Sequence, residues 1–144
     1  MAAASTGAGG PPDPPHSRPL VHTTGAAGEY MVRAVLEGFG AFTSIAPASI
    51  GYDLAAYVDD NRWIRVQVKS TNVKSRDGRY QFKTNRGLGP PLTSADCDVV
   101  AFVALPLRLC LFRNVRQVRG KTFKLTPSKF QSEFELSSWI KAIK

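Results

Sequence analysis

The clearest hydrophobic pattern in the chain is a strict alternation within the segment 51–71. Apolar side chains occupy every second position on both sides of a turn rich in Asp and Asn: Leu54, Ala56, Val58, Ile64, Val66 and Val68. A period of two on either side of a turn is typical of a β-hairpin with one buried face. The alternation therefore predicts two paired antiparallel strands.

The position of the turn predicts the register of this hairpin. A loop centred on Asp60 pairs residues equally distant from it, so that Asp53 faces Gln67. Directly opposed Cβ atoms lie about 4.5–5.5 Å apart. Asp53, Gln67 and Lys69 are therefore expected to share one face and to lie within reach of a single ion. A carboxylate, an amide oxygen and an ammonium are unsuited to a core, but they suit a metal site.

A helix is expected before the hairpin, from an N-cap at Thr23 or Thr24 to about Phe39. Its inward stripe is formed by four apolar residues: Val32, Val35, Leu36 and Phe39. Glu29 points along the edge of this stripe, where an acid is costly unless it is paired or bound to a cation. The alternative is an interfacial Glu in the first turn, where the helix dipole favours negative charge.

The other elements follow from shorter patterns. Strands are expected at 41–46, at 70–83 as a pair around the Asp77-Gly78 turn, at 99–105 as a strand buried on both faces, and at 109–112. A C-terminal helix is expected from about Ser137, with a core-facing stripe of Leu136, Trp139, Ile140 and Ile143. This order predicts an α/β fold in which helices flank a mixed central β-sheet.

Composition places the boundaries of the folded part. Residues 1–20 are rich in Ala, Gly and Pro and are expected to be a disordered tail, because they cannot bury enough apolar surface to offset the entropy of ordering. Residues 21–144 are long enough for a single domain with a core.

The net charge of +8 favours a polyanionic partner. No apolar run approaches the roughly 18 residues of a membrane span, so nucleic acid is favoured over a membrane.

The ordinary metal-binding side chains His and Cys are scarce. Cys97 and Cys110 stand apart in apolar settings, which is typical of buried free thiols in a reducing compartment and predicts an intracellular, cytoplasmic protein. The two histidines are His16 and His22, so a His/Cys zinc site is not expected. Any metal would have to be held by oxygen ligands.

A dense group of cations follows the hairpin, interleaved with aromatic residues. Its members are Lys74, Arg76, Arg79, Lys83 and Arg86. One interpretation is a solvated edge hairpin whose charges prevent aggregation. Because Asp77 is the one acid in this span, the pattern favours contacts with nucleic-acid phosphates.

A helix Glu, a strand Asp and Gln-x-Lys on the paired strand, within a basic domain, resemble the PD-(D/E)XK nuclease superfamily. The motif stands here as Tyr52-Asp53 followed by Gln67-Val68-Lys69, with Glu29 leading. It looks like the archaeal Holliday-junction resolvases and the intron-encoded homing endonucleases that use Gln in this motif. The resemblance implies a restriction-endonuclease-like core and covers most of the folded body.

The resemblance also implies roles for individual residues. It assigns the catalytic set Glu29, Asp53, Gln67 and Lys69. It assigns Mg²⁺, with Mn²⁺ as a substitute, to the side chains of Glu29, Asp53 and Gln67 and to the Val68 carbonyl. Two positions depart from the usual pattern: Tyr52 replaces a Pro, and Gln67 replaces an acid. Because an amide adds no charge, weaker metal binding is expected.

These features predict a Mg²⁺-dependent DNA endonuclease acting on duplex or branched DNA, and by analogy a homodimer, since cutting two strands usually takes two sites. A non-catalytic nucleic-acid-binding module with a degenerate site is the alternative. A small basic structural protein of a ribonucleoprotein is a third interpretation. Only the first requires Asp53 and Lys69 for activity.

Overall fold

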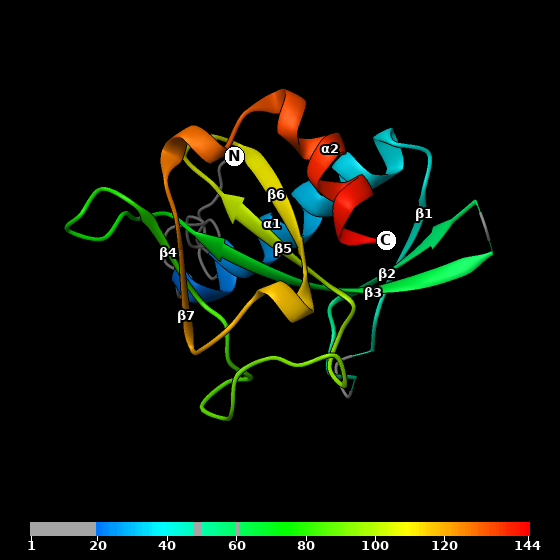
Figure 1. The fold of residues 1–144 in the computed structure, drawn as a ribbon, viewed down its shortest axis with the longest axis horizontal. Helices are drawn as coiled ribbons and strands as arrows, with labels where there is room; N and C mark the ends of the chain where they lie inside the picture. The colour runs from blue at the N-terminus through cyan, green and yellow to red at the C-terminus, as the bar shows by residue number, and fades with distance from the viewer. Residues whose placement is uncertain (1–19, 48–49, 60) are drawn as a thin grey trace, which may run out of the picture.

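The structure is a computed structural model that describes residues 20–47, 50–59 and 61–144, and it is built in three layers (Figure 1). The elements in chain order are α1 Leu20–Gly38, β1 Phe42–Ile45, β2 Leu54–Val58, β3 Arg62–Thr71, β4 Tyr80–Lys83, β5 Val99–Ala104, β6 Leu109–Asn114, the 3₁₀ turn η3 Val115–Gln117, β7 Thr122–Leu125, the 3₁₀ turn η4 Pro127–Lys129 and α2 Ser132–Ala142. The predicted tail lies outside the described residues, except for Leu20, where α1 begins.

The central layer is a five-stranded sheet in the order β1-β2-β3-β5-β6. The pairs β1–β2, β2–β3 and β5–β6 are antiparallel and the pair β3–β5 is parallel. The hairpin register is the one predicted, with Ala55 opposite Arg65 and Tyr57 opposite Trp63. The predicted fold class, an α/β domain with a mixed central sheet flanked by helices, is confirmed.

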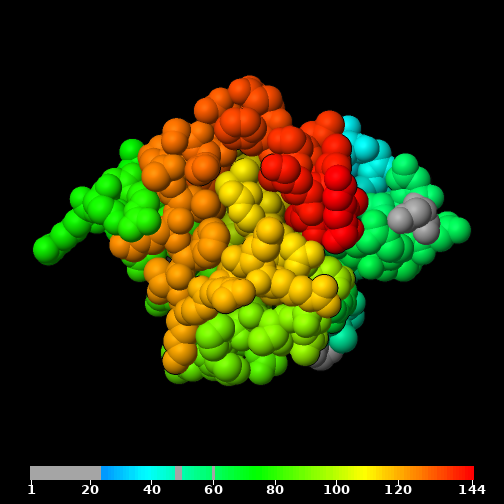
Figure 2. All heavy atoms as spheres, viewed as in Figure 1, coloured from blue at the N-terminus to red at the C-terminus, as the bar shows by residue number. Residues whose placement is uncertain are grey.

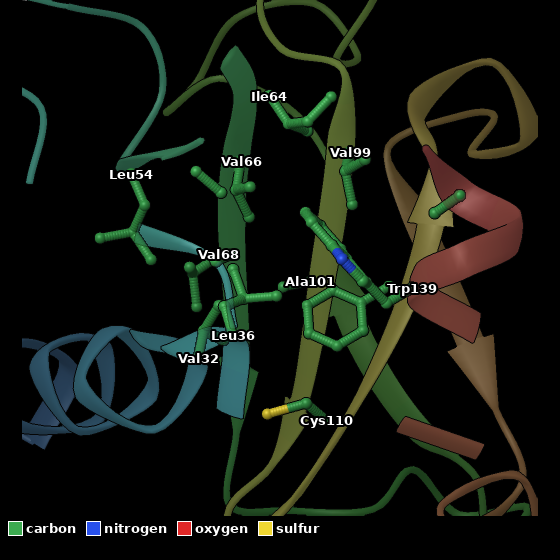
Figure 3. Packing of buried hydrophobic residues seen from close by; sticks show 14 of the residues in the cluster. Val32, Leu36, Leu54, Ile64, Val66, Val68, Val99, Ala101, Cys110 and Trp139 are labelled. Atoms are coloured by element: carbon green, nitrogen blue, oxygen red, sulfur yellow. The ribbon is translucent and has the colours of Figure 1, made fainter. Parts of the chain in front are cut away.

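Both helices pack on one face of this sheet. Val32 and Leu36 of α1 lie against Val66 and Val68 (Figure 3), and Trp139 of α2 packs on Phe112 of β6, with ring centroids 5.2 Å apart. Burying one such aliphatic side chain contributes about 1.5–3 kcal/mol, so this face holds α1 firmly against β3. The predicted inward stripe of α1 and the predicted burial of both free thiols are confirmed.

The opposite face of β5 and β6 is covered by a small second sheet of β4 and β7. The prediction of two strands paired around Asp77-Gly78 is therefore wrong in part. The turn forms, but β4 pairs with β7, and an isolated bridge between Lys74 and Tyr80 joins the two sides of the turn. Tyr80 and Phe82 lie on the buried face of β4. Tyr80 packs on Phe130 and Phe82 packs on Phe102 of β5, and this burial decides the partner of β4.

The ends of the helices differ from the prediction. Thr23 and Thr24 lie inside α1 and do not cap it, because 20–24 contains no Gly or Pro to stop the helix from extending back to Leu20. α2 begins at Ser132, five residues before the predicted start near Ser137.

The predicted core stripe of α2 is wrong at two positions. Leu136 and Ile140 are 45% and 47% exposed, while Ser138 is buried. The reason is that β6 is an edge strand with unpaired backbone groups. Glu135 accepts a hydrogen bond from the Cys110 N–H at 2.9 Å, and Ser138 accepts one from the Phe112 N–H at 3.1 Å. Polar side chains of α2 therefore occupy inward positions, where they accept hydrogen bonds from the unpaired backbone N–H groups of β6.

Candidate functional site

Asp53 lies directly before β2 and is held by two donors of β3. Its Oδ2 accepts a hydrogen bond from the Val68 N–H at 2.8 Å and another from the Gln67 amide nitrogen at 2.9 Å. The ladder between β2 and β3 ends at Leu54 and Val66, so the Val68 N–H has no backbone partner on β2. The Asp53 carboxylate takes that place, as an acceptor at the end of the strand pair.

The side chains of β3 around the site point alternately to the two faces of the sheet. The Val68 side chain belongs to the core beneath the helices, and the alternation of β3 directs Gln67 and Lys69 to the opposite face. The predicted facing of Asp53 and Gln67 is present, since the two side chains are hydrogen-bonded, and Asp53 and Lys69 lie close enough for each charge to act on the pKa of the other.

Glu29 reaches the site from α1, and Gly28 is what permits the helix to lie so close. A Cβ at position 28 would stand 1.7 Å from the Ser70 Oγ and 3.0 Å from the Ser70 Cβ. Only Gly fits without displacement of β3 or of the Ser70 side chain. Burial raises the pKa of Glu29, and the negative charge of Asp53 raises it further. The two carboxylates therefore lie close enough for their negative charges to repel each other.

Lys69 is the positive member of the site and is partly withdrawn from water. Its Nζ donates a hydrogen bond to the Asn85 carbonyl at 3.2 Å. Burial lowers the pKa of Lys69, and the nearby Asp53 opposes that shift. Burial raises the pKa of Asp53, while the Val68 N–H and Lys69 act in the lowering direction. Within the described part of the chain, neither Asp53 nor Glu29 forms an ion pair.

The available donors for a metal are all oxygen atoms. No group of three or more His, Cys, Asp and Glu residues gathers among the residues that the structure describes. A metal here would depend on Glu29 and Asp53 together with the Gln67 amide oxygen and the Val68 carbonyl. In a strand the N–H and C=O of one residue point to the same side, so the Val68 carbonyl is directed toward the side of Asp53. Hard oxygen donors suit Mg²⁺ or Mn²⁺. The metal and catalytic roles of these residues stay predictions.

The predicted phosphate-contacting residues separate into three groups: among the described residues, two line a groove, two are paired with acids, and Arg76 does neither. Lys74 and Lys83 line a groove of about 650 Å³ together with Lys69. Arg79 and Arg86 are instead paired with acids, Arg79 with Asp77 at 2.8 Å and Arg86 with Asp96 at 3.1 Å.

Arg76 lies exposed in the segment between β3 and β4, which projects from the body of the molecule at the left of Figures 1 and 2. Of the five predicted cations, the two arginines with acid partners are therefore the ones already neutralised, while Arg76 stands on the projecting segment.

Three residues of this region were not predicted from the sequence. Asn85 holds Lys69, Gly28 sets the distance of α1, and Ser70 carries a buried hydroxyl that has no hydrogen-bond partner among the described residues. A Gly inside a helical pattern, directly before the candidate Glu29, is a signal of close packing that could have been used. The role of Asn85 depends on a backbone carbonyl, which leaves no trace in residue type.

No protein-family model matches this chain, and no curated protein matches it in sequence. Its fold is similar to the solved structure of a bacterial homing endonuclease, I-Ssp6803I, with a TM-score of 0.66 and 18% sequence identity. The similarity covers 85% of this chain and 90% of that chain. The two chains therefore share an α/β fold. No helix in the described residues is long and apolar enough to cross a membrane.

Proposed function

We propose that this protein is a metal-dependent DNA endonuclease with a site of the PD-(D/E)XK type. The observation that carries the proposal is the position of Asp53. It is held at the end of a strand pair by Gln67 and the Val68 N–H, with Lys69 and Glu29 beside it. A core or a solvated surface needs no such gathering of partly buried charges, since each costs free energy to desolvate.

The residues fit a hard divalent cation by the chemistry of their donors. Asp53, Glu29, Gln67 and the Val68 carbonyl would hold Mg²⁺ or Mn²⁺. Asp53 Oδ2 already accepts two hydrogen bonds, so Oδ1 is the atom better placed to bind the metal. A bound divalent ion stabilises the charge that develops on phosphorus and lowers the pKa of a bound water.

Lys69 would supply a positive charge and hydrogen-bond donors to the reacting phosphate. The Asn85 carbonyl fixes its Nζ, and its lowered pKa reflects burial in the site. From this position the ammonium can donate to a phosphate oxygen or orient the attacking water. Removal of Lys69 is therefore expected to slow cutting without weakening the metal site greatly.

The groove that begins at Lys69 supplies the path for a nucleic-acid strand. It is lined by Lys74 and Lys83 and by the polar side chains of Ser75 and Gln81. Lysine contacts to phosphate position a backbone without reading sequence. The similarity of the fold to a bacterial homing endonuclease supports DNA as the nucleic acid.

The test is cleavage of supercoiled plasmid and of a four-way junction by the purified protein with Mg²⁺, Mn²⁺ or chelator. Cutting is expected with either metal, to be absent with chelator and to be strongly slowed in Lys69→Met. Metal-independent DNA binding without any cutting would favour the non-catalytic module instead. The products also test the proposed homodimer: direct linearisation points to two coupled sites, whereas accumulation of nicked circles points to one.

A further inference from the structure

A second cation-lined cavity lies under α2, and it contains none of the residues of the candidate nuclease site. It has a volume of about 320 Å³ and lies between β6, η4 and α2. Figure 2 looks onto this side of the molecule, where atoms of β6 (yellow) show between the orange segment that precedes α2 and the red end of that helix. A water molecule occupies roughly 30 Å³ of liquid, so the cavity has room for an anion and its waters.

Three cations from three separate elements line this cavity, namely Arg113 of β6, Lys129 of η4 and Lys141 in the last turn of α2. None of the described residues that line it is acidic. Gln117 and Ser137 add an amide and a hydroxyl, groups that can donate hydrogen bonds. An anion in this cavity would be attracted by all three positive charges, so its binding would lower the free energy of the arrangement.

Arg113 differs from the other arginines that the structure holds in place. Arg65, Arg79 and Arg86 each pair with a carboxylate. Arg113 is half-buried, and its guanidinium donates to the carbonyl of its neighbour Phe112 at 3.1 Å, with no carboxylate partner in the described part of the chain. Burial lowers the pKa of Arg113, in keeping with a charge withdrawn from water without compensation.

We propose that this cavity binds a phosphate group, held by Arg113, Lys129 and Lys141. A tetrahedral oxyanion offers several acceptors to donors that converge from different directions, and guanidinium and ammonium groups are the usual partners of phosphate. The phosphate belongs either to a nucleic-acid backbone or to a small phosphate compound. The inference does not depend on the proposed nuclease activity, because the two sites share no residue.

The first experiment titrates the full chain with inorganic phosphate, against chloride at the same ionic strength. Binding is followed by thermal unfolding and by amide NMR shifts at Gln117 and Ser137. Phosphate is expected to raise the unfolding temperature and to shift these amides. Lys141→Gln should weaken phosphate binding roughly tenfold, the effect of losing one charge-assisted hydrogen bond.

The matched control is Arg119→Gln, which removes the same charge from an exposed arginine that does not line the cavity. It should leave phosphate affinity within about twofold of the wild type. Arg113→Gln should weaken binding at least as much as Lys141→Gln; if it does not fold, the more exposed Lys141 still decides the question. The proposal is overturned if phosphate acts no differently from chloride, or if Arg119→Gln loses as much affinity as Lys141→Gln.

A second experiment separates the two sources of phosphate by measuring duplex DNA binding in chelator as a function of salt. If the cavity takes a backbone phosphate, Lys141→Gln should flatten the salt dependence by about one unit. If it takes a small phosphate compound, the variant should lose phosphate binding while DNA affinity and salt dependence stay unchanged. Either result supports a phosphate site and identifies its source.

Discussion

Two aspartates flank β3, one on each side, and they make the same kind of contact with it. Asp53 precedes β2 and accepts the Val68 N–H at 2.8 Å, while Asp98 precedes β5 and accepts the Arg65 N–H at 2.8 Å. Both carboxylates therefore cap an unpaired backbone group of the same strand. Their side-chain partners differ, and this difference separates a structural acid from a candidate functional one.

Asp98 is neutralised by its partner. Its two oxygens accept from the Arg65 guanidinium at 2.9 and 3.2 Å, and that guanidinium also donates to the Ser94 and Ala95 carbonyls. Burial acts to raise the pKa of Asp98, but the hydrogen bonds and charge of Arg65 outweigh it and hold the pKa below its usual value. This cluster ties the start of β5 to β3.

Asp53 has an amide where Asp98 has a guanidinium. Gln67 provides a hydrogen bond without charge, Lys69 lies near without forming an ion pair, and burial leaves the pKa of Asp53 raised. The lesson is that a capping geometry alone says little about function. A cap whose charge is left uncompensated marks the place where a cation from outside could bind.

The largest expected effect comes from removing the charge of Asp53. Asp53→Asn keeps an oxygen for the Val68 N–H but removes the carboxylate, so cutting should fall by about 10³-fold or more. Because burial disfavours the charged form, the unfolding temperature should stay the same or rise. Plasmid cleavage and thermal unfolding measure the two effects. A large loss of stability would show that Asp53 is structural, like Asp98.

Gln67 is the residue that makes the two aspartates different, and two substitutions test it. Gln67→Leu removes both the donor to Asp53 and the candidate ligand oxygen, and should reduce cutting by about 10²-fold. Gln67→Glu should preserve cutting and shift the Mg²⁺ requirement to lower concentration, because a carboxylate attracts the ion more strongly.

Without metal, Gln67→Glu should be destabilised by repulsion from Asp53, and Mg²⁺ should restore it. Metal titrations of cleavage and of unfolding temperature give the result. An inactive Glu variant with a fully active Leu variant would exclude Gln67 from the metal.

Asp98→Asn should show the opposite pattern, with lost stability and retained activity per folded molecule. Hydrogen bonds to charged groups contribute about 1.5–3 kcal/mol each, but the two side chains are 33% and 39% exposed, so a loss of about 1–2 kcal/mol is expected in urea unfolding.

The pH dependence of the two Asn variants should also be opposite in sign. The pKa of Asp98 is lowered, so its contribution is present above the usual value of 3.8 and disappears as the pH falls. The pKa of Asp53 is raised, so Asp53→Asn should match the wild type below pH 3.8 and gain relative stability as the pH rises above it. Parallel curves for the two variants would contradict the comparison.

The smallest expected effect compares a cation that has an acidic partner with one that has none, both on the projecting segment between β3 and β4. Arg76 has no acid partner among the described residues, whereas Arg79 pairs with Asp77, which also accepts from Lys124 at 3.2 Å. Arg76→Ala should flatten the salt dependence of DNA binding by about one unit, and Arg79→Ala by less. Binding isotherms at several salt concentrations measure both. Equal effects would show that the ion pair with Asp77 opens when DNA binds.

Much of the fold could be predicted, because its strongest signals are local. The alternation around the turn predicted the hairpin with its register, and the continuous apolar run predicted the buried strand β5. The candidate site was found for the same reason: Asp53, Gln67 and Lys69 lie on one hairpin, so strand geometry brings them together. The position of Glu29 beside the apolar stripe of α1 left its role open, and the resemblance to the nuclease superfamily assigned it to the site.

What the sequence could not decide depends on contacts between distant segments. Arg65 and Asp98 are separated by 33 positions, and Cys110 and Glu135 by 25. Nothing local says that Asp98 is neutralised, that Glu135 caps the edge strand, or that β4 pairs with β7.

The sequence by itself determined the helix α1, the hairpin of β2 and β3, the buried strand β5 and the polar residues that share that hairpin, because periods and turns act over a few residues. The tertiary structure decided which charges are compensated and which are left in the site, since a pKa and an ion pair depend on neighbours that only folding brings together.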